Sequence, residues 1–151
     1  MKKAGQAEAA NKLVQMRQAL AAAVMLGPMP QESVRVNMQL ECDPTAGGLL
    51  VDADSGGNVR GYVRHPRVGF AGDPLAGARA AVGGSGFLSV LRDLGQGRFY
   101  RGSVELSGLD LAGHLRRYFA ESEQVATALD LQVVPRGEEP LGEVAGLLVQ
   151  R

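Results

Sequence analysis

Residues 49–64 read LLVDADSGGNVRGYVR, and this stretch decides the fold class. Two apolar-rich segments, Leu49–Asp54 and Val59–Arg64, flank the polar turn Ser55–Asn58, which contains two glycines. Turns of this composition join antiparallel strands, because glycine and asparagine accept the left-handed backbone that a tight hairpin needs. The stretch therefore predicts a β-hairpin.

The segments around this hairpin predict more antiparallel strands. Ser33–Glu41 alternates apolar and polar residues, which is the period of a half-buried strand, and it forms a meander with the first hairpin. Phe87–Leu94 and Arg98–Leu106 are predicted to pair across Gly95–Gly97. This second hairpin again follows from glycine-rich punctuation between apolar segments.

The carboxy-terminal part predicts a last pair of strands. They are Ala126–Val134 and Val144–Val149, joined by the polar loop Pro135–Gly142.

Two main helices accompany the strands. Ala7–Leu26 has Met16, Leu20 and Val24 at helical spacing, and Gly27–Pro28 ends it. Asp110–Glu123 is predicted as the second helix, capped by Asp110 or by Ser107. A short helix is predicted near Leu75–Ala81.

The predicted fold class is therefore α+β, with antiparallel β-sheets packed against two main helices. A single domain covers residues 1–151.

Composition limits the possible functions. Sixteen basic residues balance sixteen acidic ones, so charge gives no reason to expect a nucleic-acid or membrane partner. The single cysteine, Cys42, cannot form an internal disulfide. The start of the chain lacks a signal peptide's apolar core, and the longest apolar run, Ala19–Leu26, is too short for a membrane span. We expect a soluble, cytoplasmic protein.

Few residue combinations in the sequence indicate catalysis or metal binding, and none does so strongly. His65 and His114 are the only histidines and are expected to be ordinary residues rather than a metal pair. Cys42 with a histidine could form a nucleophile pair, although no flanking motif supports one. Glu121 and Glu123 do not share a helix face, so paired acid–base work is not expected.

Two further segments have structural explanations. Gly83–Gly86 lacks the lysine of a phosphate-binding loop and is read as a connector. Arg98–Arg101 mixes arginines with aromatic residues as single-strand binders do, but the balanced charge argues against that role.

Residues 118–127 read YFAESEQVAT and contain a specific pattern: Tyr-Phe, two variable residues, Ser-Glu-Gln, two variable residues, then Thr. The six pattern residues are Tyr118, Phe119, Ser122, Glu123, Gln124 and Thr127. This pattern resembles a signature of the redox-regulated heat-shock chaperones called the 33 kDa chaperonin or HslO family. VRGY at 59–62, RFYRG at 98–102 and GLLVQ at 146–150 match the family in the same order, so the resemblance covers the chain from about Leu13 onward.

The resemblance implies a function. Proteins of this family bind unfolding clients without ATP, so the chain is expected to be a holdase module of the heat-shock response and not an enzyme. Its partners would be unfolded or partly folded proteins and a second copy in a homodimer. The family's first strand and its carboxy-terminal zinc domain have no counterpart here, and Cys42 matches none of the four zinc ligands. We therefore expect no cofactor and no zinc-dependent redox switch in this chain.

Two other functions stay open. The chain could be a structural or regulatory scaffold that has lost client binding, or a small enzyme that uses Cys42 or the histidines. Within the signature, Ser122, Glu123 and Gln124 are expected to hold the helix–strand junction by hydrogen bonds.

As a holdase, the chain would need exposed apolar surface to bind unfolded clients. The candidates are strand residues with apolar neighbours on both faces: Leu49, Val51, Leu88, Val90, Leu129, Leu131, Leu147 and Val149. We expect most of them to be buried, since an apolar strand residue is usually core.

Overall fold

The computed structural model describes residues 16–26, 34–42, 48–64, 85–136 and 139–151. A helix over residues 16–26 precedes the labelled elements. These are β1 (Arg35–Cys42), β2 (Gly48–Asp54), β3 (Val59–Val63), β4 (Gly86–Gly95), β5 (Arg98–Glu105), α3 (Leu111–Tyr118), the π-helical turn η1 (Phe119–Glu123), β6 (Thr127–Arg136) and β7 (Glu139–Gln150). The predicted α+β class with antiparallel sheets is confirmed.

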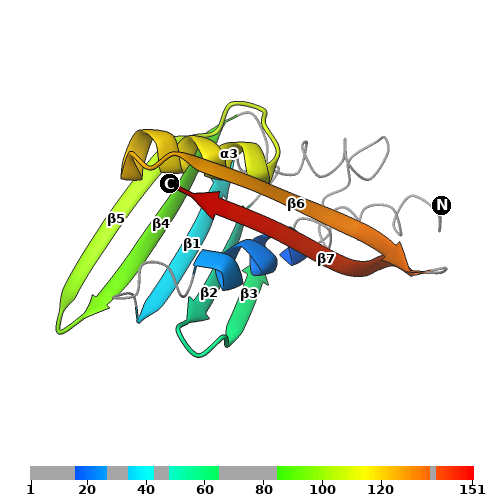
Figure 1. The fold of residues 1–151 in the computed structure, drawn as a ribbon, viewed down its shortest axis with the longest axis horizontal. Coiled ribbons are helices and arrows are strands. Elements are labelled where there is room, and N and C mark those ends of the chain that lie inside the picture. The colour runs from blue at the N-terminus through cyan, green and yellow to red at the C-terminus, as the bar shows by residue number, and fades with distance from the viewer. Residues whose placement is uncertain (1–15, 27–33, 43–47, 65–84, 137–138) are drawn as a thin grey trace.

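The strands form two sheets. Five strands pair in the order β3-β2-β1-β4-β5, and β6 pairs with β7 in a long separate hairpin. The hairpin crosses in front of the helix over residues 16–26 and the larger sheet (Figure 1). Strand β1 pairs with both β2 and β4, so it joins the two predicted hairpins into one sheet.

The β2–β3 turn forms for a local reason. The Asp54 carboxylate accepts hydrogen bonds from the backbone N–H groups of Gly56 and Asn58, at 2.9 and 3.0 Å, and from the Asn58 side chain at 2.9 Å. Gly57 has a φ of +87°, which a residue with a Cβ rarely adopts. The turn in the opening sequence stretch is therefore closed by its own side chains.

One predicted boundary is wrong. The segment Pro135–Gly142 is not a long loop, because β6 runs to Arg136 and β7 begins at Glu139. A register shift between Val134 and Arg136 accommodates Pro135, which has no N–H to give to the ladder. The second helical segment runs from Leu111 to Glu123, as predicted within one residue, although its part beyond Tyr118 is the π-helical turn η1. Its cap is Asp110, whose side chain accepts from the Gly113 N–H at 2.8 Å. Residues 7–15 of the first helix and the short helix near 75–81 lie outside the described residues.

Both helical segments pack on the same face of the five-stranded sheet. A cross-strand row on that face runs Gly61, Val51, Met38, Val90 and Gly102. It has a glycine at each end, where a helical segment approaches. A Cβ on Gly61 would lie 2.5 Å from Met16 Sδ, and a Cβ on Gly102 would collide with Ser122 Oγ and lie 2.8 Å from Tyr118 Cε2. The two glycines therefore allow close contact of the helical segments with the sheet.

The helix over residues 16–26 buries a different stripe from the predicted one, on which Met16 and Leu20 are only half-buried. Ala19, Ala22, Ala23 and Leu26 are fully buried, whereas Val24 is 41% exposed. Small alanines let the helix lie close to the sheet, and the stripe keeps helical spacing. Among the described residues, no helix is long and apolar enough to cross a membrane.

Candidate functional site

The signature begins with two aromatic side chains that are part of the core. Tyr118 and Phe119 are both fully buried. Their ring centroids are 5.4 Å apart at an interplanar angle of 69°, which is the edge-to-face arrangement that aromatic quadrupoles favour. Neither ring is placed to contact a ligand in this structure.

Glu123 forms the centre of a buried polar cluster. It accepts from Arg92 Nε at 2.7 Å and from Tyr118 Oη at 3.1 Å. Arg92 also donates from Nη1 to the Leu26 carbonyl, at 3.3 Å, near the end of the first helix. The Arg92 side chain is 4% exposed and that of Glu123 is 16% exposed. The ion pair thus links β4 to η1, the hydrogen bond to Leu26 links β4 to the first helix, and the Glu123 carboxylate compensates the buried charge of Arg92.

The rest of the signature joins η1 to β5 and holds the start of the β6–β7 hairpin. Tyr100 donates from its hydroxyl to the Ser122 carbonyl at 2.9 Å. Gln124 has a φ of +56° and ends the helical segment. Thr127 Oγ1 donates to the Val125 carbonyl and accepts from Gln150 Nε2, each at 3.1 Å. All six signature residues therefore position structural elements.

Six of the eight client-binding candidates lie in the core and offer no surface in this structure. They are Leu49, Val51, Leu88, Val90, Leu129 and Leu131, none more than 7% exposed. These six are therefore not surface residues here, which agrees with the expectation that most of the eight are buried. The candidates in β2 and β4 lie on the face of the five-stranded sheet that the helical segments cover. Leu129 and Leu131 lie on the inner side of β6.

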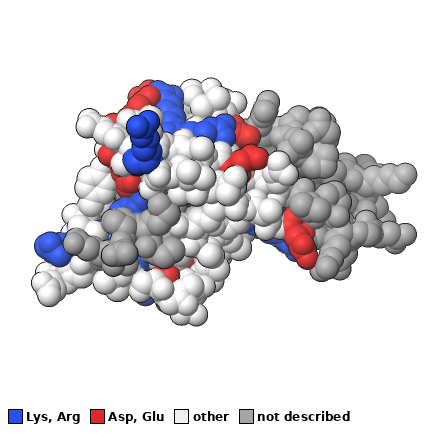
Figure 2. Space-filling view, viewed as in Figure 1, with Lys and Arg blue, Asp and Glu red and all other residues white. Residues whose placement is uncertain are grey.

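Leu147 and Val149 are the two candidates that reach solvent. They are 65% and 56% exposed and lie on the outer face of the β6–β7 hairpin, opposite Asp130 and Ala128 in the register. Figure 2 shows that the surface over this hairpin is mostly uncharged, while charged side chains gather near α3. The outer face of the hairpin is thus one accessible apolar surface.

A second accessible surface was missed in the sequence. The face of the five-stranded sheet opposite the helical segments, here called the open face, carries Tyr62, Phe87 and Phe99, which are 63%, 46% and 62% exposed. Leu50 and Leu91 are half-buried on the same face. The alternation of residues along the strands could have predicted this surface. Once Met38 is assigned to the buried face, the register between β1 and its neighbours assigns these aromatic residues to the opposite face.

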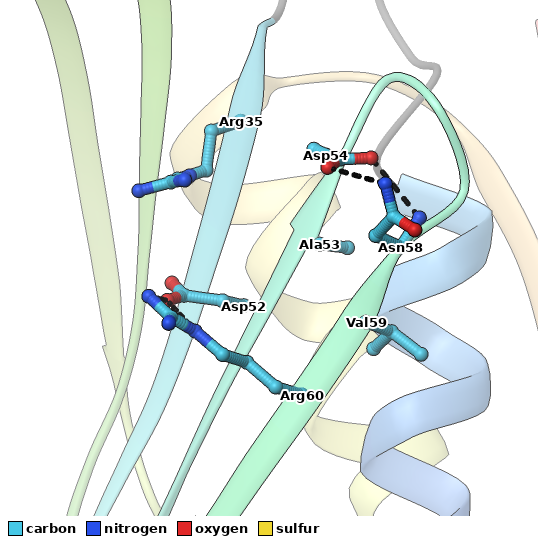
Figure 3. A pocket seen from close by; sticks show the side chains of 7 residues that line it. All are labelled: Arg35, Asp52, Ala53, Asp54, Asn58, Val59 and Arg60. Atoms are coloured by element: carbon cyan, nitrogen blue, oxygen red, sulfur yellow. Dashed lines mark hydrogen bonds and ion pairs between the residues drawn. The ribbon is translucent and has the colours of Figure 1, made fainter.

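Charged side chains between the aromatic residues on the open face are engaged with one another. Asp52 accepts from Asn37 Nδ2 at 2.7 Å and from Arg60 at 2.9 and 3.1 Å. Burial alone would raise the pKa of Asp52, but these hydrogen bonds outweigh it and lower the pKa below its usual value. Arg35, Asp52 and Arg60 line a shallow hollow of about 200 Å³ beside the β2–β3 turn (Figure 3). Its ion pair is a surface feature, with the Arg60 side chain 76% exposed.

The one described histidine is structural. His114 is fully buried, and its Nε2 accepts from the Ser107 N–H at 2.9 Å while Nδ1 lies 3.0 Å from the Asp110 carbonyl. That carbonyl accepts only, so Nδ1 carries the proton and the ring is neutral. Burial lowers the pKa of His114, although the hydrogen bond to Asp110 opposes this. Among the described residues, no group of three or more His, Cys, Asp or Glu could hold a metal ion. His65 and the Cys42 side chain lie outside the described part of the chain.

Comparison with known proteins agrees with this fold. A family model described as Hsp33 protein matches residues 3–151. The 33 kDa chaperonin of Gloeobacter violaceus is 41% identical over 122 residues, which are 80% of this chain and 40% of that protein. That of Synechocystis sp. is 40% identical over 136 residues, 87% of this chain and 44% of that protein. The crystal structure of the 33 kDa chaperonin from Thermotoga maritima matches with a TM-score of 0.75 and 28% identity, over 94% of this chain and 51% of that one.

Fold and sequence define the same class of protein, an α+β domain of the kind that 33 kDa chaperonins carry. The chain belongs to the Hsp33 protein family. It spans less than half the length of the two curated relatives described above.

Proposed function

We propose that this domain is an ATP-independent holdase that binds unfolding proteins on the open face of the sheet and on the outer face of the β6–β7 hairpin. The observation that carries the proposal is the exposure of Tyr62, Phe87 and Phe99 on the open face. Large apolar side chains left in solvent can mark an interaction surface, and these three are among the most exposed aromatic residues that the structure describes. The names of the relatives as chaperonins support the same function.

The strength of such binding suits a holdase. Covering exposed apolar area contributes about 25 cal/mol per Å² before the costs of association. An aromatic residue buries roughly 150–250 Å² when fully covered. Three aromatic residues that are already partly covered by the domain therefore give weak, broad binding. Weak binding permits release without ATP.

Charge makes a protein client a better fit than nucleic acid. Among the described strand residues on the open face, three are basic (Arg35, Arg60 and Arg101) and five are acidic (Glu41, Asp52, Asp54, Asp93 and Glu105). Binding of phosphates requires a basic surface, because affinity comes largely from released counterions. The excess of carboxylates among these described residues opposes a polyanion and favours apolar contact as the source of affinity.

The proposal is tested by light scattering of a thermally unfolding client under reducing conditions without ATP. We expect suppression of aggregation at near-stoichiometric amounts of this chain. The double variant Tyr62→Ser/Phe99→Ser should lose most of the suppression while keeping its circular dichroism spectrum. Leu109→Ser is the matched control, since Leu109 is 41% exposed but lies in the loop before α3.

The outcome separates two functions. If the folded chain does not suppress aggregation, or if the double variant suppresses it as well as the parent chain, client binding on the open face is refuted. The remaining function would then be that of a structural scaffold, since all six signature residues make contacts inside the domain.

We also propose a homodimer, because β3 and β5 are edge strands of the larger sheet. Sedimentation analysis of the chain tests it: a single monomeric species at assay concentrations would refute the dimer.

A further inference from the structure

Strand β5 lies at one edge of the five-stranded sheet (Figure 1), and the hydrogen-bond register shows which of its backbone groups face outward. The Leu106 N–H donates to the Gly86 carbonyl at 2.9 Å. These two residues lie directly opposite each other, because the β4–β5 register pairs their neighbours Phe87 and Glu105. Leu106 is therefore a hydrogen-bonded position of an antiparallel pair.

Hydrogen-bonded positions recur at every second residue of such a pair. Alternate residues from Leu106 back to Tyr100 thus direct their N–H and C=O groups toward β4. The residues between them, Phe99, Arg101 and Ser103, direct theirs away from β4, and we call these three the β5 edge. Within the described ranges, no strand pairs with this outer side of β5.

The next residue of the outward set supports the assignment. Glu105 alternates with Leu106, so its backbone also faces away from β4. Its carbonyl accepts a hydrogen bond from Arg117 Nη1 at 3.4 Å, which agrees with a position outside the β4–β5 ladder. Arg117 therefore covers the end of the strand near α3, and the β5 edge is the part that a partner strand can reach.

The residues of the β5 edge also carry their side chains on the open face. Phe99 is 62% exposed, and Arg101 and Ser103 are exposed as well. A residue of an added antiparallel strand that lies directly opposite Phe99 would exchange two backbone hydrogen bonds with it and contact its ring. Backbone pairing and aromatic contact are thus available to one and the same partner residue.

The opposite edge of the sheet separates these two properties. At β3, the Arg64 N–H donates to the Gly48 carbonyl at 2.9 Å, so the backbone of Tyr62, two residues earlier, faces β2. The exposed Tyr62 ring is therefore carried by a residue whose backbone is already paired. A strand added at β3 would bond to its neighbours Gly61 and Val63, whose side chains belong to the buried face.

We propose that the β5 edge captures an extended segment of an unfolding client by antiparallel strand addition, with an apolar client residue opposite Phe99 and an acidic one opposite Arg101. The inference rests on the proposed function and names how the client is held. Backbone hydrogen bonds form with any sequence that lacks proline at the bonded positions, so they suit broad binding. The side chains opposite the edge then favour segments of matching pattern.

A second copy of this chain fits the β5 edge less well than a client does. Apart from Phe99, the open-face residues of β5 are Arg101, Ser103 and Glu105, none of them apolar. An antiparallel copy that sets Arg101 opposite Glu105 carries Phe99 past the end of the other strand, and the ring stays in solvent. A copy that sets the two Phe99 rings opposite each other overlaps only at the start of β5. The proposed homodimer would then use β3.

The test is an NMR titration of the isotope-labelled whole chain with three short peptides that share their side chains. Phenylalanine, glutamate and threonine occupy the alternate positions meant to lie opposite Phe99, Arg101 and Ser103. One peptide is unmodified, one is N-methylated on the backbone of these three residues, and one on the residues between them. Only the first methylation removes N–H groups that an antiparallel strand donates to β5, so it should weaken binding about tenfold, and the second should not.

The amide signals of the β5 edge report the binding. Equal affinities of the two methylated peptides, or no shift of these signals with the unmodified peptide, would overturn strand addition. Light scattering separates this failure from that of the proposed function. A chain that suppresses aggregation but fails the peptide test would still be a holdase that uses another surface.

A proline substitution tests the edge from the side of the chain. Ser103→Pro removes an outward N–H and no hydrogen bond of the sheet, so the fold should be kept while peptide affinity falls about tenfold. Val59→Pro is the matched control, because Val59 also faces outward, but at β3, and its peptide affinity should match the parent chain. Unchanged affinity in Ser103→Pro would refute the inference. Conversion of a dimer to a monomer by Ser103→Pro would assign the edge to a second copy and also refute it.

Discussion

One face of the five-stranded sheet buries Met38 and Val90 beneath two helical segments, whereas the other face leaves Tyr62 and Phe99 in solvent. The same strands supply both faces, and the residues simply alternate. The buried face ends at a glycine on each side, which admits a helix or a π-helical turn. The open face has large side chains at the corresponding edges. Residue size at the edges therefore distinguishes the face that is closed from the face that is available for binding.

The two faces also treat charge differently. On the buried face, the ion pair between Arg92 and Glu123 has side chains only 4% and 16% exposed. On the open face, Arg60 pairs with Asp52 while its own side chain is 76% exposed. Breaking the first pair leaves a charge in the core, and breaking the second leaves a charge in water. The comparison predicts very different energetic costs for similar substitutions.

The largest effect is expected for Glu123→Ala, which removes the buried partner of Arg92. The free energy of unfolding should fall by about 3 kcal/mol, because Arg92 stays charged and poorly solvated. Urea denaturation at neutral pH measures this loss. A fall below about 1 kcal/mol would mean that water reaches Arg92, and the contrast between the faces would weaken.

A smaller loss is expected for Gly102→Ala at the edge of the buried face. The new Cβ meets Ser122 and Tyr118, so the free energy of unfolding should fall by about 2 kcal/mol through overpacking. Gly56→Ala in the β2–β3 turn is the control, because there the nearest atom, Asp54 Oδ1, is 3.2 Å from the new Cβ, and this contact is looser than the one at Gly102. Equal losses in the two variants would show that the close approach at Gly102 is unimportant.

The free energy of unfolding should also depend on pH, because His114 in α3 is buried. Because the folded state lowers the pKa of His114, its contribution to stability is present above the unfolded pKa of about 6.5 and is lost as pH falls through the folded value. Urea titrations from pH 7.5 down to pH 5 should show this decline. His114→Gln does not titrate and should have a flatter profile in that range. Identical slopes for the two proteins would contradict the assignment of a neutral, buried ring.

The smallest effect is expected on the open face. Arg60→Ala should change the free energy of unfolding by less than about 0.5 kcal/mol, because the exposed pair with Asp52 is screened by solvent. The same urea titration measures it, with Glu123→Ala as the reference. A loss approaching that of Glu123→Ala would show that the open face is covered in solution.

Much of the local structure could be predicted from the sequence. The turn Ser55–Asn58 carries its own hydrogen-bonding groups, and the alternation in Ser33–Glu41 follows the two-residue period of a strand. The Pro135–Gly142 segment was misread as a loop, because proline and glycine there interrupt a pattern that the ladder continues through a register shift. The signature was found as a motif, but its connection with Arg92 joins residues 31 positions apart and leaves no local trace.

The candidate binding surface could likewise be predicted only in part from the sequence. An alternating strand specifies two faces, but it does not say which apolar residues a helix will cover. Leu49 and Leu147 are both leucines in strands, yet one is 1% and the other 65% exposed.

The sequence by itself determined the α+β class, the hairpins and the family, because these depend on period, turn chemistry and motifs encoded within a few residues. Only the tertiary structure decided that β1 joins the two hairpins, that Arg92 meets Glu123, and that Tyr62 and Phe99 stay in solvent. The physical reason is that burial is a property of contacts between distant segments. A side chain's exposure depends on what packs over it, and in this domain the packing elements lie tens of residues away along the chain.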